Sequence, residues 1–408
     1  MTHRTRVRWG LCVGGLLVLA ACTGTKNPGE ERLLRARRGR GDVAIAAAWP
    51  WELRKEIRYG EGLQLAIDEL NASGGIAGRR LRLVKYDDKE SIDEGRVVAQ
   101  RSADDPDVVA VVGHLQSYVT LQAAHIYDQA GLVLVAPTST APELTEQGFK
   151  RVFRATFTDE SLGHQLADFA AARGFRRLAI YYIRNTYGRN VANAFEMRAV
   201  QDGISVAARE SYDPSERANA RTFEQVLLQW KTAELDAIFV AGEVPSAAIF
   251  VAQARAAGIG VPMLGGDAMS SPGLLTVAGP AAEGMTVASF FHGDEPRPEV
   301  TRFVATFEKR YGVPPDAGSA LGYDCVQLVA AAMRAAGSVV PEEFAKTLHT
   351  LRDFPGVTGS FTFDEHGEAV GKPIVMSVVR RGEFAYLSVA AQSGSASGSS
   401  APNGVVKR

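Results

Sequence analysis

Short apolar runs alternate with stretches of helical periodicity along most of this chain. The run VAIAAAW at residues 43–49 predicts a strand, and the apolar positions at 63, 66, 67 and 70 follow the i, i+3, i+4, i+7 spacing of an amphipathic helix. The segment NASGGIAG then ends that helix with Asn and Gly. Further strands are predicted at 81–86, 108–113 and 132–137, separated by helices at about 91–103 and 117–130. Repeated strand–helix–strand units favour a parallel sheet with helices on both faces.

The same alternation starts again near residue 160. The predicted helices are 160–173, 188–202, 217–232 and 245–257, and the predicted strands are 178–183, 205–212, 237–242 and 262–266. This series indicates a second α/β lobe. After a strand at 285–291, the chain has helical patterns near 297–311, 319–336 and 341–350 but only short strands around 360–363 and 373–387. These strands are too few for a third sheet, so we expect the last third to be shared between the two lobes.

Polar and aromatic residues directly follow most of the predicted strands. They are Trp49-Pro50-Trp51, Asp87-Asp88, His114–Ser117, Thr138–Thr140, Arg184–Tyr187, Gly242-Glu243 and Asp267. Ligands of open parallel sheets bind outside the carboxyl ends of the strands. Because these residues come from both predicted lobes, we expect a binding cleft between the lobes.

Four of these positions have the chemistry to hold an α-amino acid. Ser117 and the N–H groups at the start of its helix can bind a carboxylate, and Thr140 can add a hydroxyl. The carbonyl of Thr138 can accept from an ammonium group, and Asp267 supplies the anion that a buried ammonium requires. Taken singly, Ser117 is better explained as a helix N-cap, and an N-cap is likewise the alternative for Asp267. An anion site in one lobe and an ammonium site in the other together predict a clamp for a zwitterion.

Signatures of catalysis and nucleotide binding are absent from the sequence. Residues 113–117 do not form a G-x-S-x-G elbow, and there is no H-E-x-x-H, C-x-x-C or G-x-x-x-x-G-K-[ST]. We therefore predict that the protein is not an enzyme and uses no cofactor or metal, and we interpret His114 as scaffolding. Lys plus Arg number 45 against 46 Asp plus Glu, so nucleic-acid binding has no electrostatic support.

The two ends of the chain differ from the folded part. An apolar core too short to span a bilayer ends in LAAC, which resembles a bacterial lipobox. We predict that 1–22 is a lipoprotein signal peptide with Cys22 as the lipidated anchor, with an ordinary secretory signal as the alternative. Residues 23–41 are predicted to be a flexible tether, and the Ser/Gly/Ala-rich residues 390–408 a disordered tail. Cys325 has no partner and is expected in the core.

The order of several motifs over residues 42–389 resembles type I periplasmic solute-binding proteins of the leucine/isoleucine/valine-binding kind. They include AIDELNASGGIAGRRLRLVKYDD, GHLQSYVTLQAAHIYDQAGLVLVAPTSTAPELT, FRATFTDESLG, LGGDAMSSPGLL and FTFDEHGE. The resemblance implies an α/β fold with two Rossmann-like, flavodoxin-like lobes that have parallel sheets, are joined by three crossovers and close on a ligand. The N-terminal lobe would comprise 42–157 and 290–372, and the C-terminal lobe 158–289 and 373–389.

By position, the resemblance assigns Ser117 and Thr140 to the ligand carboxylate. It assigns the Thr138 backbone and the Asp267 carboxylate to the ammonium group, and it makes Tyr187 close over the ligand from the second lobe. The implied function is an extracytoplasmic receptor, lipid-anchored in the periplasm or at the cell surface, that delivers a branched-chain or related amino acid to an ABC permease. A sensor or regulatory lipoprotein that acts through protein partners is the alternative.

The side-chain pocket departs from the family pattern. Glu243 takes the place of a family tyrosine and would favour a polar or cationic group on the ligand. Ala320 takes the place of a bulky aromatic, and Gln116 that of a half-cystine. Trp49 and Trp51 are expected to line the pocket instead, with packing on the lobe surface as the alternative for either ring.

Overall fold

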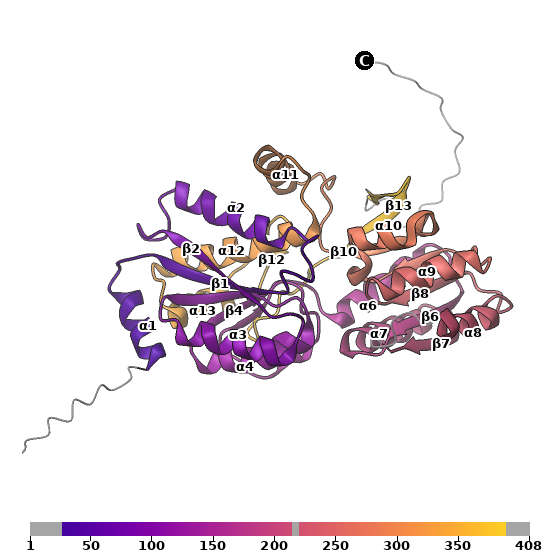
Figure 1. Ribbon diagram of the computed structural model, residues 1–408, viewed down its shortest axis with the longest axis horizontal. Coiled ribbons are helices and arrows are strands. Elements are labelled where there is room, and N and C mark those ends of the chain that lie inside the picture. Colours follow the sequence, from indigo (N-terminus) through magenta and orange to yellow (C-terminus); the bar gives the residue numbers. More distant parts are fainter. Residues whose placement is uncertain (1–26, 214–219, 389–408) are drawn as a thin grey trace, which may run out of the picture.

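The computed structural model describes residues 27–213 and 220–388. The predicted signal peptide with Cys22, residues 23–26 of the predicted tether and the predicted tail at 390–408 lie outside the described residues. The described chain forms two α/β lobes that lie side by side, the first in indigo and purple and the second in magenta and orange (Figure 1). None of the described helices is both long and apolar enough to cross a membrane.

The first lobe is built on a five-stranded sheet in the order β2-β1-β3-β4-β5, and all of its pairs are parallel. The strands are β1 (Val43–Trp49), β2 (Leu81–Asp87), β3 (Val108–Gly113), β4 (Val133–Ala136) and β5 (Val152–Arg154). The sequence pattern predicted the first four. It missed β5, because a strand of three residues is too short to show a period.

Strand β1 shows how the sequence places this sheet between two helical layers. Its odd-numbered residues, 43 to 49, pack with α2 (Tyr59–Ala72), α12 (Ala317–Ala336) and α13 (Pro341–His349). Its even-numbered residues are alanines that pack under α3 (Ile92–Asp104) and α4 (Ser117–Gln129). Side chains alternate across a strand, so one buried strand serves both cores.

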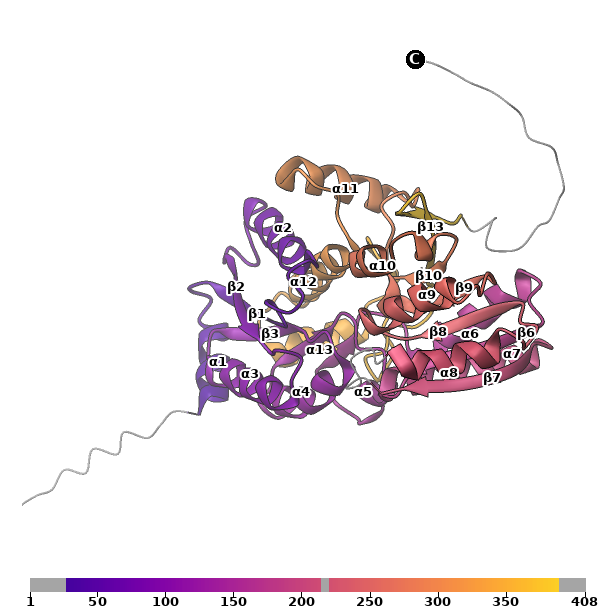
Figure 2. The same ribbon diagram turned by 45° about the vertical axis from the view of Figure 1, so that its right-hand side comes forward.

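The remaining first-lobe elements come from the last third of the chain or are short. They are α5 (Glu143–Glu146), α11 (Pro298–Tyr311) and the antiparallel pair of β11 (Phe354–Gly356) and β12 (Gly359–Phe361). Figures 1 and 2 both show α12 and α13, in orange, among the purple elements of the first lobe. The expectation that the last third is shared between the lobes is confirmed.

The second lobe is built on a seven-stranded sheet in the order β14-β13-β10-β9-β8-β6-β7. The strands are β6 (Arg177–Ile183), β7 (Ser205–Tyr212), β8 (Ala237–Ala241), β9 (Met263–Gly265), β10 (Thr286–Ser289), β13 (Val375–Arg380) and β14 (Glu383–Tyr386). Strands β6 to β10 are parallel as predicted, and β13 and β14 add an antiparallel edge.

Helices cover both faces of the second sheet. They are α6 (Asp159–Ala172), α7 (Thr186–Gln201), α8 (Ala220–Trp230), α9 (Ser246–Ala256), α10 (Pro272–Ala278) and the short 3₁₀ turns η1 (Asp267–Met269) and η2 (Gly279–Ala282). Phe195 of α7 stacks on Phe239 of β8 on one face. On the other face Tyr181 of β6 stacks on Phe250 of α9, so each helical layer is held by an aromatic contact.

The chain passes between the two sheets at three places, after β5, after β10 and before β13. Phe157 and Phe290, on the first two crossovers, stack with ring centroids 4.8 Å apart. Near the third, buried Lys372 donates to the Thr358 carbonyl at 2.8 Å and lies over the Phe361 ring. Burial lowers the pKa of Lys372 to about 7, against the opposing charge of Asp324. The crossovers are therefore packed segments.

The prediction of a flexible tether at 23–41 is wrong for the part that the structure describes. Residues Pro28–Arg37 form helix α1, with Pro in the first turn, acidic residues after it and Asn27 as the N-cap. Both views place α1 on the side of the first lobe away from the second (Figures 1 and 2). The basic, Gly-flanked composition pointed to a solvated segment, but the helix packs against the lobe.

Arg32 makes the most buried polar contacts between α1 and the first lobe. Its side chain is 2% exposed. Its guanidinium donates to the carbonyls of Val108 at 2.6 Å, Ala103 at 2.6 Å and Ala130 at 2.8 Å. These acceptors lie at the ends of three first-lobe elements. One buried cation thus satisfies several backbone groups and fastens the helix to the lobe.

Candidate functional site

A cavity of about 160 Å³ lies between the lobes, at the carboxyl ends of both sheets. Every predicted ligand-binding residue except Trp51 lines it. From the first lobe these are Gln116, Ser117, Thr138 and Thr140, and from the second Tyr187, Glu243 and Asp267. The fold therefore brings residues that follow different strands, more than 150 positions apart in the sequence, to one cavity.

Trp51 does not line the cavity, so the prediction that it lines the pocket is wrong. The alternative, that its ring packs on the surface of the lobe, agrees with the structure. Its indole N–H donates to the Tyr86 carbonyl at 2.9 Å, and the Lys85 ammonium lies 4.6 Å from the centre of its ring. Trp49 does line the cavity and stacks on Tyr59 at 4.0 Å. Trp49 ends strand β1 within the core, whereas Trp51 follows a Pro and turns over the edge strand β2.

Ser117 is the first residue of α4 rather than its cap. The cap position belongs to Gln116, whose side chain makes no capping hydrogen bond. The first N–H groups of the helix that bond backwards are those of Val119 and Thr120, both to the Gln116 carbonyl. The N–H groups of Ser117 and Tyr118 therefore stand at the open, partly positive end of a 13-residue helix that borders the cavity.

Thr138 and Thr140 follow β4 on the same side of the cavity. The Thr138 hydroxyl donates to the Leu115 carbonyl at 2.8 Å and ties the two strand-end loops together. Thr138, whose carbonyl is predicted to face the ligand, lines the cavity. The Thr140 hydroxyl lies beside the carboxylate of Asp159, and the Thr140 carbonyl accepts from the Asp159 N–H at 2.8 Å.

Asp267 and Tyr187 form the second-lobe wall of the cavity. The Tyr187 hydroxyl donates to Asp267 Oδ1 at 2.8 Å, and Asp267 is 8% exposed. Burial raises the pKa of Asp267 to about 6, although the hydrogen bond from Tyr187 favours the anion. Gly266 makes this approach possible, because a Cβ there would overlap the Tyr187 hydroxyl. At neutral pH the wall thus presents a carboxylate.

Asp159 is a buried carboxyl group next to the site that the sequence did not reveal. It is fully buried and accepts from Asn190 Nδ2 of α7 at 3.0 Å. Burial, helped by the charge of Asp267, raises its pKa to about 7, against the hydrogen bonds from Thr140 and Asn190. In the sequence it reads as an ordinary acidic residue in a first helical turn, so no local signal marks it.

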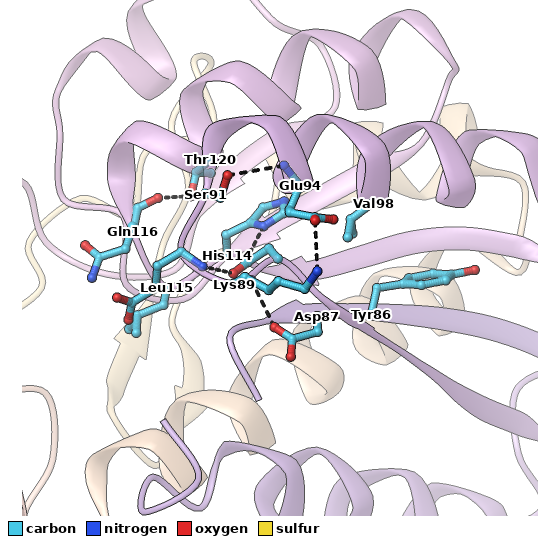
Figure 3. A network of polar contacts seen from close by, with 12 residues as sticks. Tyr86, Asp87, Lys89, Ser91, Glu94, Val98, His114, Leu115, Gln116 and Thr120 are labelled. Carbon is cyan, nitrogen blue, oxygen red and sulfur yellow. Dashed lines mark hydrogen bonds and ion pairs between the residues drawn. The ribbon is translucent and has the colours of Figure 1, made fainter. Parts of the chain in front are cut away.

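His114 is scaffolding, as expected. The ring is fully buried, with Nδ1 2.6 Å from Asp88 Oδ2 and Nε2 3.1 Å from the Tyr127 hydroxyl. Figure 3 shows His114 beside the start of α3, where Ser91 accepts from the Glu94 N–H. Both ring nitrogens face protein groups, so His114 holds the loop after β3 in place and does not reach the cavity.

The rest of the lining is largely apolar, with charged groups at one side. Leu115, Leu321 and Phe290 contribute hydrocarbon. Ala320, predicted at the position of a pocket aromatic, instead packs fully buried against the α11 cluster, and its neighbour Leu321 lines the cavity. Successive residues of helix α12 point about 100° apart, so Ala320 and Leu321 lie on different faces of the helix and only Leu321 lines the cavity.

Glu243 lies at the charged side of the cavity and accepts from Asn185 Nδ2 at 2.7 Å. Arg54 lies there too, held by the carboxylate of Glu90. Asn185 falls in a strand-end segment that was predicted to face the cleft. Arg54 lies five residues beyond the end of β1, too far along the loop for the strand-end rule to indicate it.

The sequence matches the family model for periplasmic binding proteins over residues 57–383. Among curated relatives, the Leu/Ile/Val-binding protein of Escherichia coli (strain K12) is 30% identical over 320 residues, which are 77% of this chain and 84% of that protein. The leucine-, isoleucine-, valine-, threonine- and alanine-binding protein of Pseudomonas aeruginosa is 28% identical over 316 residues, 76% of this chain and 83% of that protein.

Solved structures agree with these relatives. An ABC transporter substrate-binding protein of Desulfitobacterium hafniense, in complex with Leu, is 36% identical and has a TM-score of 0.77, covering 85% of this chain and 100% of its own. A leucine-binding protein of Thermotoga maritima is 28% identical with a TM-score of 0.76, covering 85% and 98%. The chain therefore belongs to the periplasmic binding protein family, to its type I branch of Leu/Ile/Val-binding-protein-like, solute-binding members.

Proposed function

We propose that this protein binds the α-amino and α-carboxylate groups of an amino acid between its lobes and delivers it, as a lipid-anchored receptor, to an ABC transporter. The observation that carries the proposal is the convergence of a helix N-terminus from one lobe and a carboxylate from the other on one cavity. The names of two curated relatives state amino-acid binding, and that of the Desulfitobacterium hafniense protein in complex with Leu states an ABC transporter, which supports the same reading. Cys22 is the proposed site of the lipid.

The proposed clamp divides the charges of the ligand between the lobes. The ligand carboxylate would accept from the Ser117 hydroxyl and the first N–H groups of α4, where the helix dipole favours an anion. Its ammonium would donate to Asp267 and to the Thr138 carbonyl, with the Tyr187 ring alongside. Since the charged partner of the ammonium, Asp267, comes from the second lobe and the carboxylate site from the first, the ligand stabilises the closed arrangement relative to the open one.

The clamp is tested by titrating amino acids into the wild type, Asp267→Asn and Ser117→Ala in a calorimeter. Removing the anion leaves a buried ammonium without its partner, which costs about 3 kcal/mol or more than about a hundredfold in affinity. Ser117→Ala removes one neutral donor and is expected to cost about tenfold. Asp168→Asn, an exposed substitution on α6, is the matched control and leaves affinity unchanged. Wild-type affinity in Asp267→Asn would overturn the ammonium site.

A further inference from the structure

Glu243 is a half-buried carboxylate on the cavity wall. Burial raises its pKa, and the hydrogen bond from Asn185 and the charge of Arg54 oppose that rise. It belongs to the loop after β8, and its side-chain hydrogen bond comes from the neutral amide of Asn185 at 2.7 Å. Within residues 27–213 and 220–388, it forms no ion pair with a Lys or Arg. Asn185 fixes one carboxylate oxygen, Oε1, and both residues line the cavity.

The cation that lines the same cavity is already engaged. Arg54 is bound through Nε and Nη2 to the two carboxylate oxygens of Glu90, a two-pronged pair that holds the guanidinium on the first lobe. Asp316, another acidic residue of the lining, has its own partner, Arg58, whose backbone N–H donates to it at 2.9 Å. Among the charged residues that line the cavity, Arg54 and Asp316 thus have charged partners of their own, whereas the direct partner of the Glu243 carboxylate is the neutral amide of Asn185.

This charge stands next to hydrocarbon. Trp49, Leu115 and Leu321 line the same cavity from the first lobe, and Val244 follows Glu243 directly. When the lobes close over a ligand, Glu243 loses water. A purely hydrocarbon side chain would leave the carboxylate desolvated and unpaired, whereas a side chain with an apolar stem and a terminal N–H donor would satisfy it.

We propose that Glu243 is a specificity-determining residue that selects amino acids whose side chain has an apolar stem and ends in a nitrogen donor. The proposal rests on the proposed function, because it requires a ligand that the zwitterion clamp holds in the cavity that Glu243 lines. Two effects separate the ligands. A side chain with an N–H donor gains the Glu243 carboxylate as a partner, whereas a hydrocarbon side chain leaves that carboxylate buried and unpaired.

The test uses pairs of ligands that share a stem and differ at the tip. Lysine is compared with norleucine, and glutamine with methionine, by calorimetric titration of the wild type, Glu243→Gln and Glu243→Leu. The wild type is expected to bind lysine and glutamine at least about tenfold tighter than their apolar partners. Glu243→Leu reverses the preference, and Glu243→Gln keeps glutamine but loses lysine. Thermal unfolding of each variant verifies that it folds.

Three results would overturn the proposal. Preference of the wild type for norleucine and methionine, unchanged in Glu243→Leu, refutes the selecting role while leaving the clamp intact. The same preference combined with weaker apolar binding in Arg54→Gln shows that Glu243 pairs with Arg54 on closure instead. If no α-amino acid binds the wild type at all, the proposed function fails together with this inference.

Discussion

At the scale of the residue, the site contains some side chains whose position could be predicted from the sequence and others whose position could not. Ser117, Thr140 and Asp267 could be predicted because each follows a strand, and the carboxyl ends of parallel strands meet at one edge. Asp159 could not, because its importance lies in contacts with Thr140 and Asn190 that only the folded chain creates. Side-chain direction after a Pro likewise separates Trp51 from the cavity.

The carboxylate of Asp267 is expected to lower the stability of the ligand-free protein at neutral pH. Burial raises its pKa from 3.8 to about 6, so the folded state binds this proton more tightly than the unfolded chain does. The protonated Asp267 side chain stabilises the folded state fully below about pH 4, and this stabilisation is lost as the pH rises through about 6. Asp267→Asn should therefore unfold at a higher temperature than the wild type at about pH 7.5, with little difference near pH 4. Equal melting temperatures at both pH values would contradict this.

At the scale of the element, period was a better guide than composition. The longer strands and helices appear where the apolar spacing put them, because burial of one face or of both faces leaves a repeat in the sequence. Helix α1 escaped prediction since its composition is basic and its most buried contact, that of Arg32, is made by a charged side chain. Such a residue looks like a solvated one until its acceptors are known.

Arg32→Met is expected to destabilise the first lobe by about 3 kcal/mol or more, because the carbonyls of Val108, Ala103 and Ala130 would stay buried without their donor. Urea unfolding of the full chain measures the loss. Arg37→Met, an exposed change on the same helix, serves as the control and should stay within about 0.5 kcal/mol of the wild type. Similar unfolding midpoints for the two variants would show that α1 contributes little.

At the scale of the whole molecule, two lobes and a shared last third could be predicted from the order of elements. The residue at which the folded part begins could not be predicted, since helix α1 extends the first lobe to residue 28. Only four residues lie between Cys22 and the N-cap Asn27, so a lipid on Cys22 would hold the first lobe near a membrane.

The proposed anchor gives a test on the full chain. Cys22→Ala is expected to move the exported protein from the membrane fraction to the soluble fraction, with its amino-acid affinity unchanged, because the cavity lies at the far side of the first lobe from α1. Fractionation followed by titration of the purified protein measures both. Retention of the variant in the membrane fraction would contradict lipidation at this residue.

The return of the last third to both lobes has a consequence for how the protein is made. Helices α12 and α13 cover a core of the first sheet, and β13 completes the second beside β10. While a ribosome is still synthesising the first 300 residues, each sheet has a bare face or an open edge. Neither lobe can finish on its own, so the nascent chain becomes a receptor only when its final segment arrives, and both halves of the binding site become complete at nearly the same moment.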